Sequence, residues 1–289
     1  MESSSTASLA PLVSAAWLAA HLSAPDLVVL DCSWYLPSSG RDADAEYRAR
    51  HIPGALRLDL DAISDSTSDL PHMLPAAPDF AAVMERMGVR PSDRVICYDG
   101  SGVNLSAARA WWTFRIFGHR DSAVLDGGFP AWAAATRPVQ RGVITRPPTG
   151  YRVPELDRAM VRDRRAVEVI AEAYGPTQIV DCRPALRFEG KADEPRAGVR
   201  RGNIPGSINL PFTELTDEAT GVMRSPAALR KLFEAHQIDA SRPIVALCGS
   251  GTSAAGLALA VEVLRTSNDG PVGPPVAIYD GSWTEWGKV

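Results

Sequence analysis

The feature that most constrains the fold of this chain is an internal repeat. Four short motifs from the first half of the sequence recur in the same order in the second half, at a nearly constant separation. The matched segments are 28–32 with 178–182, 51–55 with 203–207, 93–102 with 241–251, and 125–128 with 279–282. Because the separation is close to half the chain, a solenoid of short units is excluded. The repeat instead predicts two copies of one domain.

The boundary between the copies is expected where proline and glycine cluster and the apolar pattern lapses, in the stretch that ends at residues 147–150. We therefore predict a first domain at residues 10–139, a linker at residues 140–154 and a second domain at residues 155–289. The length of 289 residues is enough for two domains of ordinary size.

Short apolar runs alternate with stretches of helical spacing in both halves. Strands are expected at residues 28–30, 95–98, 179–182 and 244–247, and helices at residues 80–87, 107–117, 167–173, 227–236 and 254–264. The strands are almost continuously apolar, as they are when helices cover both faces of a sheet. This alternation predicts an α/β fold, with a mainly parallel sheet flanked by helices in each domain.

Composition excludes several classes of function. A net charge of -4 argues against a nucleic-acid-binding protein, and no apolar run reaches the ~18 residues that a membrane span needs. The N-terminus lacks the basic residues of a secretory signal, so we expect a cytoplasmic protein. The four cysteines form no Cys-x-x-Cys pair, and we therefore expect no metal site.

Cys248 differs from the other cysteines in its surroundings. It directly follows the apolar run 244–247 and precedes Gly249-Ser250-Gly251-Thr252-Ser253, after which a helix is expected. Ligands of parallel sheets bind at the carboxyl ends of strands, and glycines let N–H groups converge on an anion near a helix N-terminus. A cysteine in this setting is expected to be partly thiolate, which is the nucleophilic form.

A phosphatase also uses a cysteine in such a loop, and it requires an arginine at the sixth position after the cysteine. Here that position is Ala254, so no guanidinium is present to bind a phosphate with paired hydrogen bonds. The sequence therefore disfavours phosphate chemistry.

The two-repeat layout, the Ile-Pro-Gly motifs, the loop 248–254 and the segment 279–286 together resemble the rhodanese superfamily, and within it the 3-mercaptopyruvate sulfurtransferases. The resemblance extends from about residue 12 to residue 286 and implies two tandem rhodanese-like domains. Asp99 stands in the first repeat where Cys248 stands in the second. The first domain is therefore expected to be non-catalytic.

The resemblance implies an enzyme that moves the sulfur of 3-mercaptopyruvate, a small 2-oxo thiol, through a Cys248 persulfide to a thiol or cyanide acceptor and releases pyruvate. Thioredoxin is a candidate acceptor, and no cofactor is implied. Thiosulfate-specific members usually carry basic residues after the cysteine, whereas Gly249 and Ser250 stand here. Two alternatives stay open, namely a thiosulfate:cyanide sulfurtransferase and a slow sulfur-carrier or redox-sensing module.

Further site residues follow from the resemblance alone. Arg187 and Arg196 match a pair of arginines that bind the carboxylate and carbonyl of the donor. Ser250, His72 and Asp61 match a Ser–His–Asp arrangement that handles a proton, which requires the first domain to close over the loop of the second. The loop residues Gly249, Gly251, Thr252 and Ser253 are expected to line the substrate site. Thr252-Ser253 replaces the usual Val-Thr, a change expected to affect helix-start packing or rate.

Overall fold

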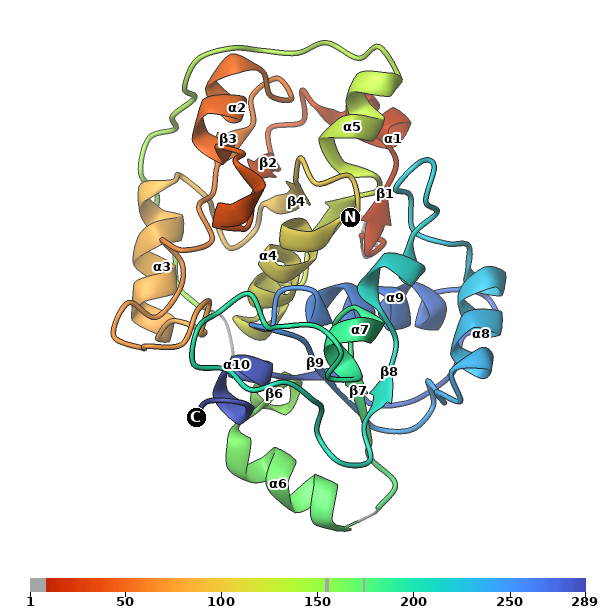
Figure 1. The fold of residues 1–289 in the computed structure, drawn as a ribbon. Coiled ribbons are helices and arrows are strands. Elements are labelled where there is room, and N and C mark those ends of the chain that lie inside the picture. Colours follow the sequence, from red (N-terminus) through yellow and green to blue (C-terminus); the bar gives the residue numbers. More distant parts are fainter. Residues whose placement is uncertain (1–8, 154–155, 174) are drawn as a thin grey trace, which may run out of the picture.

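The computed structural model describes residues 9–153, 156–173 and 175–289. The predicted end of the linker at residue 154 and the start of the second domain at residue 155 lie outside these ranges. Two domains are present, each built on a five-stranded parallel sheet with flanking helices (Figure 1). The α/β fold with two tandem domains that the repeat predicts is confirmed.

The two sheets have the same strand order. The first runs β1 (Leu12–Val13), β5 (Ser122–Leu125), β4 (Arg94–Tyr98), β2 (Leu27–Asp31), β3 (Leu56–Arg57). The second runs β6 (Val161–Arg162), β10 (Ala277–Tyr279), β9 (Ile244–Leu247), β7 (Gln178–Asp181), β8 (Ile208–Asn209). The carboxyl ends of each set of parallel strands therefore meet at one edge, where the loops that follow β4 and β9 lie in corresponding positions.

Helices cover both sheets. Those of the first domain are α1 (Ala15–His21), α2 (Ala43–Ala49), α3 (Ala77–Arg86), α4 (Leu105–Ile116) and α5 (Gly128–Ala134). Those of the second are α6 (Arg164–Ala173), α7 (Ala185–Phe188), α8 (Pro226–Ala235), α9 (Ala254–Arg265) and α10 (Ser282–Trp286). Single 3-10 turns occur at η1 (Pro37–Ser39), η2 (Arg158–Met160) and η3 (Phe212–Leu215). Within the described residues, no helix is long and apolar enough to cross a membrane.

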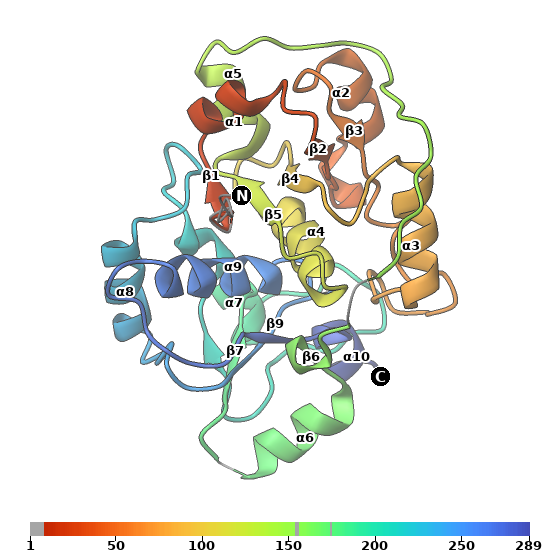
Figure 2. The ribbon, with the colours of Figure 1, turned by 180° about the vertical axis from the view of Figure 1, so that it is seen from behind.

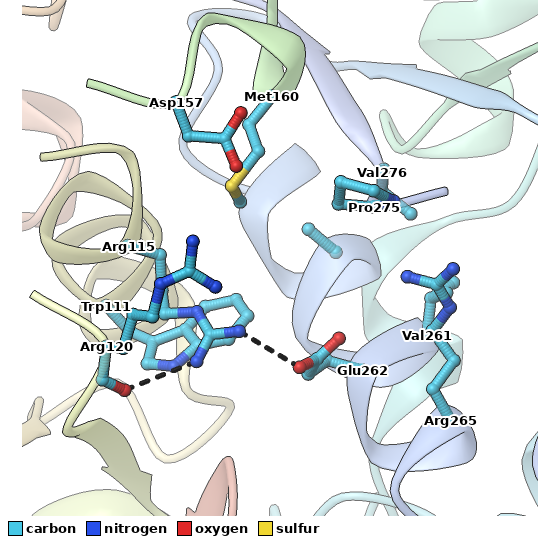
Figure 3. Close-up of a pocket in the computed structure, with 11 residues that line it drawn as sticks. Trp111, Arg115, Arg120, Asp157, Met160, Val261, Glu262, Arg265, Pro275 and Val276 are labelled. Carbon is cyan, nitrogen blue, oxygen red and sulfur yellow. Dashed lines mark hydrogen bonds and ion pairs between the residues drawn. The ribbon is translucent and has the colours of Figure 1, made fainter. Parts of the chain in front are cut away.

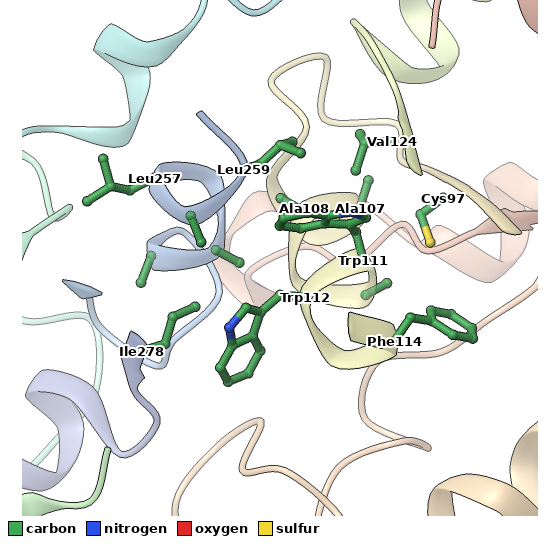
Figure 4. Close-up of a cluster of buried hydrophobic side chains, with 14 of the residues drawn as sticks. Cys97, Ala107, Ala108, Trp111, Trp112, Phe114, Val124, Leu257, Leu259 and Ile278 are labelled. Carbon is green, nitrogen blue, oxygen red and sulfur yellow. The ribbon is translucent and has the colours of Figure 1, made fainter. Parts of the chain in front are cut away.

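The two domains pack through helices α4 and α9, which lie next to each other at the centre of the molecule in both views (Figures 1 and 2). Trp111, Trp112 and Phe114 of α4 are buried in one cluster with Leu257 and Leu259 of α9 (Figure 4). Burial of one such side chain stabilises a protein by about 1.5–3 kcal/mol. The apolar core is therefore continuous across the interface, and the active loop, defined as residues 248–253 directly before α9, begins within it at Cys248.

The interface has an approximate twofold symmetry. Leu74 donates its N–H to Asp280 Oδ2 at 2.7 Å, across to the second domain. In the opposite direction, Met223 donates its N–H to Asp126 Oδ1 at 2.8 Å. Met223 follows Leu74 by 149 positions, and both aspartates belong to the repeated Asp-Gly motif. Each domain therefore receives an equivalent loop of the other.

Candidate active site

Cys248 lies directly at the carboxyl end of β9 and is 2% exposed. The beginning of α10 holds this end of the loop in place. The Cys248 carbonyl accepts a hydrogen bond from the N–H of Trp283 at 2.9 Å, and the Gly249 carbonyl accepts from the N–H of Thr284 at 3.0 Å and its hydroxyl at 2.6 Å. The Cys248 N–H donates to Ser282 Oγ at 3.3 Å. The carbonyls thus point away from the loop, towards α10.

The N–H groups of residues 249–253 have no hydrogen-bond acceptor in the part of the chain that the structure describes. Gly251 takes a φ of +76°, a left-handed conformation that glycine adopts without steric cost, and α9 begins at Ala254. Free N–H groups beside the N-terminus of a twelve-residue helix form a site for an anion. A thiolate or a persulfide on Cys248 is such an anion.

In the equivalent loop of the first domain, the carboxylate of Asp99 accepts hydrogen bonds from residues that follow it in the chain. Asp99 Oδ1 accepts from the N–H of Ser101 at 2.8 Å, and Oδ2 accepts from the N–H of Ala107 at 2.8 Å and the hydroxyl of Ser106 at 3.2 Å. Several N–H groups of this loop are therefore occupied in the first repeat, and the Gly100 N–H also donates to Ser33 Oγ at 2.9 Å. Asp99 thus binds its own loop, at the position where Cys248 stands in the second domain.

Arg187 and Arg196 converge on the residue that follows Cys248. A Cβ atom added to Gly249 would lie 3.2 Å from Arg187 Nη2 and 3.7 Å from Arg196 Nη1. Burial lowers the pKa of Arg196, and negative charge at Cys248 acts in the opposite direction. The absence of a side chain at position 249 thus lets both guanidinium groups approach the residue that follows Cys248.

The two arginines are held differently. Arg187 forms an ion pair with Glu194, and Glu194 Oε1 also accepts from Arg183 Nη1 at 2.7 Å. Arg183 in turn pairs with the buried Asp181 at 2.6 Å. Arg196 makes no ion pair or side-chain hydrogen bond among the described residues. Arg187 is therefore fixed by a buried charge network that the sequence analysis missed, while Arg196 keeps its donors for a ligand.

His72 enters the site from the first domain and is buried. Its Nε2 lies 3.3 Å from Asp61 Oδ1, and its Nδ1 lies 3.1 Å from Ser250 Oγ. The Thr252 hydroxyl lies at the same distance of 3.1 Å from Nδ1. The structure therefore brings Asp61, His72 and Ser250 together, and it adds Thr252 to the group.

Trp34 supports this group, although no motif pointed to it in the sequence. Its ring meets the imidazole of His72 edge-on, with 4.5 Å between centroids. Its Nε1–H donates to Asp61 Oδ2 at 3.1 Å. The hydrogen bond with His72 lowers the pKa of Asp61, and the one from Trp34 acts in the same direction. Asp61 is therefore ionised at neutral pH and orients the imidazole.

Ser253 is placed away from these groups. It lines a small cavity with Leu105 and Phe212, at the contact between the two domains. A larger cavity of about 430 Å³ opens beside the active loop and is lined by Arg196, Thr284 and residues 68–71. Because Thr284 holds the Gly249 carbonyl, this cavity lies next to the loop and provides space for a small ligand.

Known proteins share this arrangement over most of the chain. The sequence model of the family described as "Rhodanese-like domain" matches residues 14–135 and again residues 166–288. The 3-mercaptopyruvate sulfurtransferase of Rattus norvegicus is 43% identical over 281 residues, which cover 95% of this chain and 91% of that protein. The Thiosulfate/3-mercaptopyruvate sulfurtransferase 1, mitochondrial, of Arabidopsis thaliana is 39% identical over 314 residues, covering 98% and 77%.

A solved structure agrees with these sequence matches. The crystal structure of SseA from Escherichia coli, described under the rhodanese fold and catalytic mechanism of 3-mercaptopyruvate sulfotransferases, superposes with a TM-score of 0.84. The sequence identity is 35%, and the match covers 95% of this chain and 99% of that one.

Proposed function

The chain belongs to the rhodanese family, and from this premise we propose that it is a sulfurtransferase that uses 3-mercaptopyruvate as donor and Cys248 as sulfur carrier. The resemblance noted in the sequence is thereby confirmed at the level of the family. The observation that carries the proposal is the convergence of Arg187 and Arg196 over Gly249, beside a cysteine whose loop N–H groups are free.

The two arginines suit a 2-oxo acid. The donor has a carboxylate and an adjacent carbonyl, both planar groups that accept hydrogen bonds, and a guanidinium offers paired donors with a permanent charge. Arg196, which has no other charged partner in the described structure, binds the carboxylate, and Arg187 binds the carbonyl oxygen. This orientation directs the donor sulfur towards Cys248.

Sulfur transfer follows by nucleophilic attack. The Cys248 thiolate attacks the donor sulfur, an S–S bond forms, and the bond between that sulfur and C3 of the donor breaks. The electron pair of the broken bond stays on C3 as the enolate of pyruvate. The proton of the donor thiol moves to C3, which leaves pyruvate and a Cys248 persulfide anion. The loop N–H groups stabilise this anion as they would an oxyanion.

Ser250 and His72 handle the proton in this proposal. Asp61 holds Nε2 of the imidazole, so that Nδ1 faces the hydroxyl of Ser250 and exchanges a proton with the substrate through it. In the second half-reaction an acceptor thiolate, or cyanide, attacks the outer persulfide sulfur and restores the Cys248 thiolate. Thioredoxin as acceptor and a cytoplasmic location remain predictions.

Pyruvate release from 3-mercaptopyruvate with a small thiol acceptor tests the proposal, with the Cys248→Ser variant as control and thiosulfate run in parallel. We expect rapid release by the wild type, none by the variant, and slow turnover of thiosulfate. Activity that survives in Cys248→Ser would exclude the persulfide mechanism. Faster turnover of thiosulfate would keep Cys248 as carrier and favour the thiosulfate:cyanide alternative, and a single turnover without recycling would favour the slow carrier.

A further inference from the structure

We propose that Arg109, a residue of the non-catalytic domain, is a positioning residue for the reaction because it holds His72 against the active loop of the other domain. The inference rests on the proposed function and adds a group to its machinery. Arg109 lies on α4 and is 3% exposed. Its Nη2 donates to the main-chain carbonyl of His72 and also to Asp280 Oδ1, at 2.7 Å.

His72 needs such support because its backbone is unusual. Its φ is +59°, in the left-handed region that residues with a Cβ atom rarely adopt. The second repeat has Gly221 at the matching position, with a φ of +69°. Arg109 holds the carbonyl of His72, and Asp280 accepts the N–H of Leu74 two residues later. The Arg109–Asp280 ion pair thus fixes the turn that presents the imidazole.

Arg109 also contacts the loop that carries Ser250. A Cβ atom added to Gly251 would lie 2.8 Å from Arg109 Nη1, so the guanidinium packs directly on the backbone of that glycine. Nη1 has no hydrogen-bond partner in the described part of the chain, and the guanidinium carbon lies 4.5 Å from the ring centroid of Trp112. One buried side chain therefore touches both sides of the contact between His72 and the loop.

A comparison of the two halves of the interface indicates that Arg109 does more than join the domains. Matching residues of the two repeats are 149 positions apart in this region, as Asp99 and Cys248 are, and likewise His72 and Gly221. The residue that matches Arg109 is Ala258. In the half of the interface without catalytic groups, Asp126 accepts instead from the neutral amide of Asn104 at 3.2 Å. The arginine occurs only in the half that contains the histidine and the cysteine.

The same helix provides a matched control. Arg115 of α4 forms an ion pair with Glu262 of α9 at 3.1 Å and lines a separate cavity of about 310 Å³ between the domains (Figure 3). This pair also joins the two domains through an arginine and a carboxylate, and it contacts none of the active-site residues. Arg115→Met therefore reports what the loss of an inter-domain ion pair does on its own.

The first experiment compares kcat and KM for 3-mercaptopyruvate in Arg109→Met and Arg115→Met. Displacement of a catalytic group by about 1 Å costs on the order of 100-fold in rate. We expect Arg109→Met to lower kcat by about 10- to 100-fold with little change in KM, and Arg115→Met to leave kcat nearly unchanged. Arg109→Lys keeps the charge and the hydrogen-bond donors, but it loses Nη1, which packs on Gly251, and the planar group near Trp112. It should therefore lie in between, and it serves if Arg109→Met does not fold.

A double-mutant cycle with His72→Ala separates positioning from general destabilisation. If Arg109 acts through His72, its replacement has no further effect on kcat once the imidazole is gone. An equal loss in both backgrounds, or an equal loss in Arg115→Met, would overturn the inference. The proposed function fails separately, since it requires pyruvate release by the wild type and none by Cys248→Ser, whatever the Arg109 variants do.

Discussion

Two hydroxyl groups lie within hydrogen-bonding distance of one nitrogen of His72, and this geometry leads to a testable prediction. Ser250 Oγ and Thr252 Oγ1 each lie 3.1 Å from Nδ1. With Nε2 directed at Asp61, Nδ1 of the neutral imidazole has a single lone pair and accepts from one hydroxyl at a time. We therefore expect Thr252 to replace Ser250 in part as the proton-handling group when Ser250 is removed.

The expected losses in kcat follow from the presence of two hydroxyl groups that can each donate to Nδ1. A neutral hydrogen bond contributes about 1 kcal/mol, which corresponds to about a fivefold change in rate. Ser250→Ala and Thr252→Val are each expected to lower kcat for pyruvate release by about fivefold. The double variant removes every hydroxyl from Nδ1, and it is expected to lose the full contribution of general acid–base catalysis, on the order of 100- to 10,000-fold. The loss in the double variant thus exceeds the product of the two single losses.

Ser253→Ala is the control for this series, because Ser253 belongs to the same loop and lines the cavity near Leu105 rather than facing His72. Its kcat should equal that of the wild type. The assay is steady-state pyruvate release at saturating donor and acceptor, with melting temperatures measured for all variants. The reasoning is refuted if Ser250→Ala alone is as slow as the double variant, or if the two single losses simply multiply.

Three further predictions concern other parts of the molecule. Gly249→Ala should raise KM for the donor by about fivefold without lowering the melting temperature, because the new Cβ displaces the flexible end of Arg187. Asp99→Cys should lower the free energy of unfolding by about 2 kcal/mol in denaturant titrations, because buried N–H groups lose their carboxylate acceptor. Mass spectrometry of this variant should find no second persulfide. Burial raises the pKa of Cys32 and Cys182 well above the ordinary value, so peptide mapping should find both unalkylated by iodoacetamide at mildly alkaline pH and labelled only as the pH rises further.

The parts of the structure that depend on neighbours in the sequence are predictable from it. The strand at 244–247 and the helix that begins at Ala254 are confirmed, because a buried apolar run and a helical pattern are local signals. Ser14 accepts the N–H of Trp17 at 3.1 Å and so caps α1, which is another contact between near neighbours in the chain. The edge strands β1, β3, β6 and β8 have two residues each, too few to show a period of two, and the sequence did not reveal them.

Contacts across the domain interface are not predictable in this way. Thr252 and His72 are 180 positions apart, and the departure from the usual valine suggested altered packing rather than a hydrogen bond. Arg109 stands in an apolar helix without any motif, and its partner Asp280 was noted only as part of the repeat. Such pairs depend on how two folded domains dock, which local propensity and periodicity do not encode.

Under the proposed function, the docking of the domains gives the first domain, which has Asp99 in place of Cys248, a part in the site. On one side of the twofold interface Gly221 packs so closely on the Gly102 carbonyl that any added Cβ would overlap it. A side chain at that position is therefore excluded. On the other side, Arg109 and Asp280 hold the matching turn so that the imidazole of His72 reaches Ser250. One contact cannot be both closed against a glycine and open to an imidazole, so under the proposed function the two copies of the fold, which differ at this point, each contribute to one site.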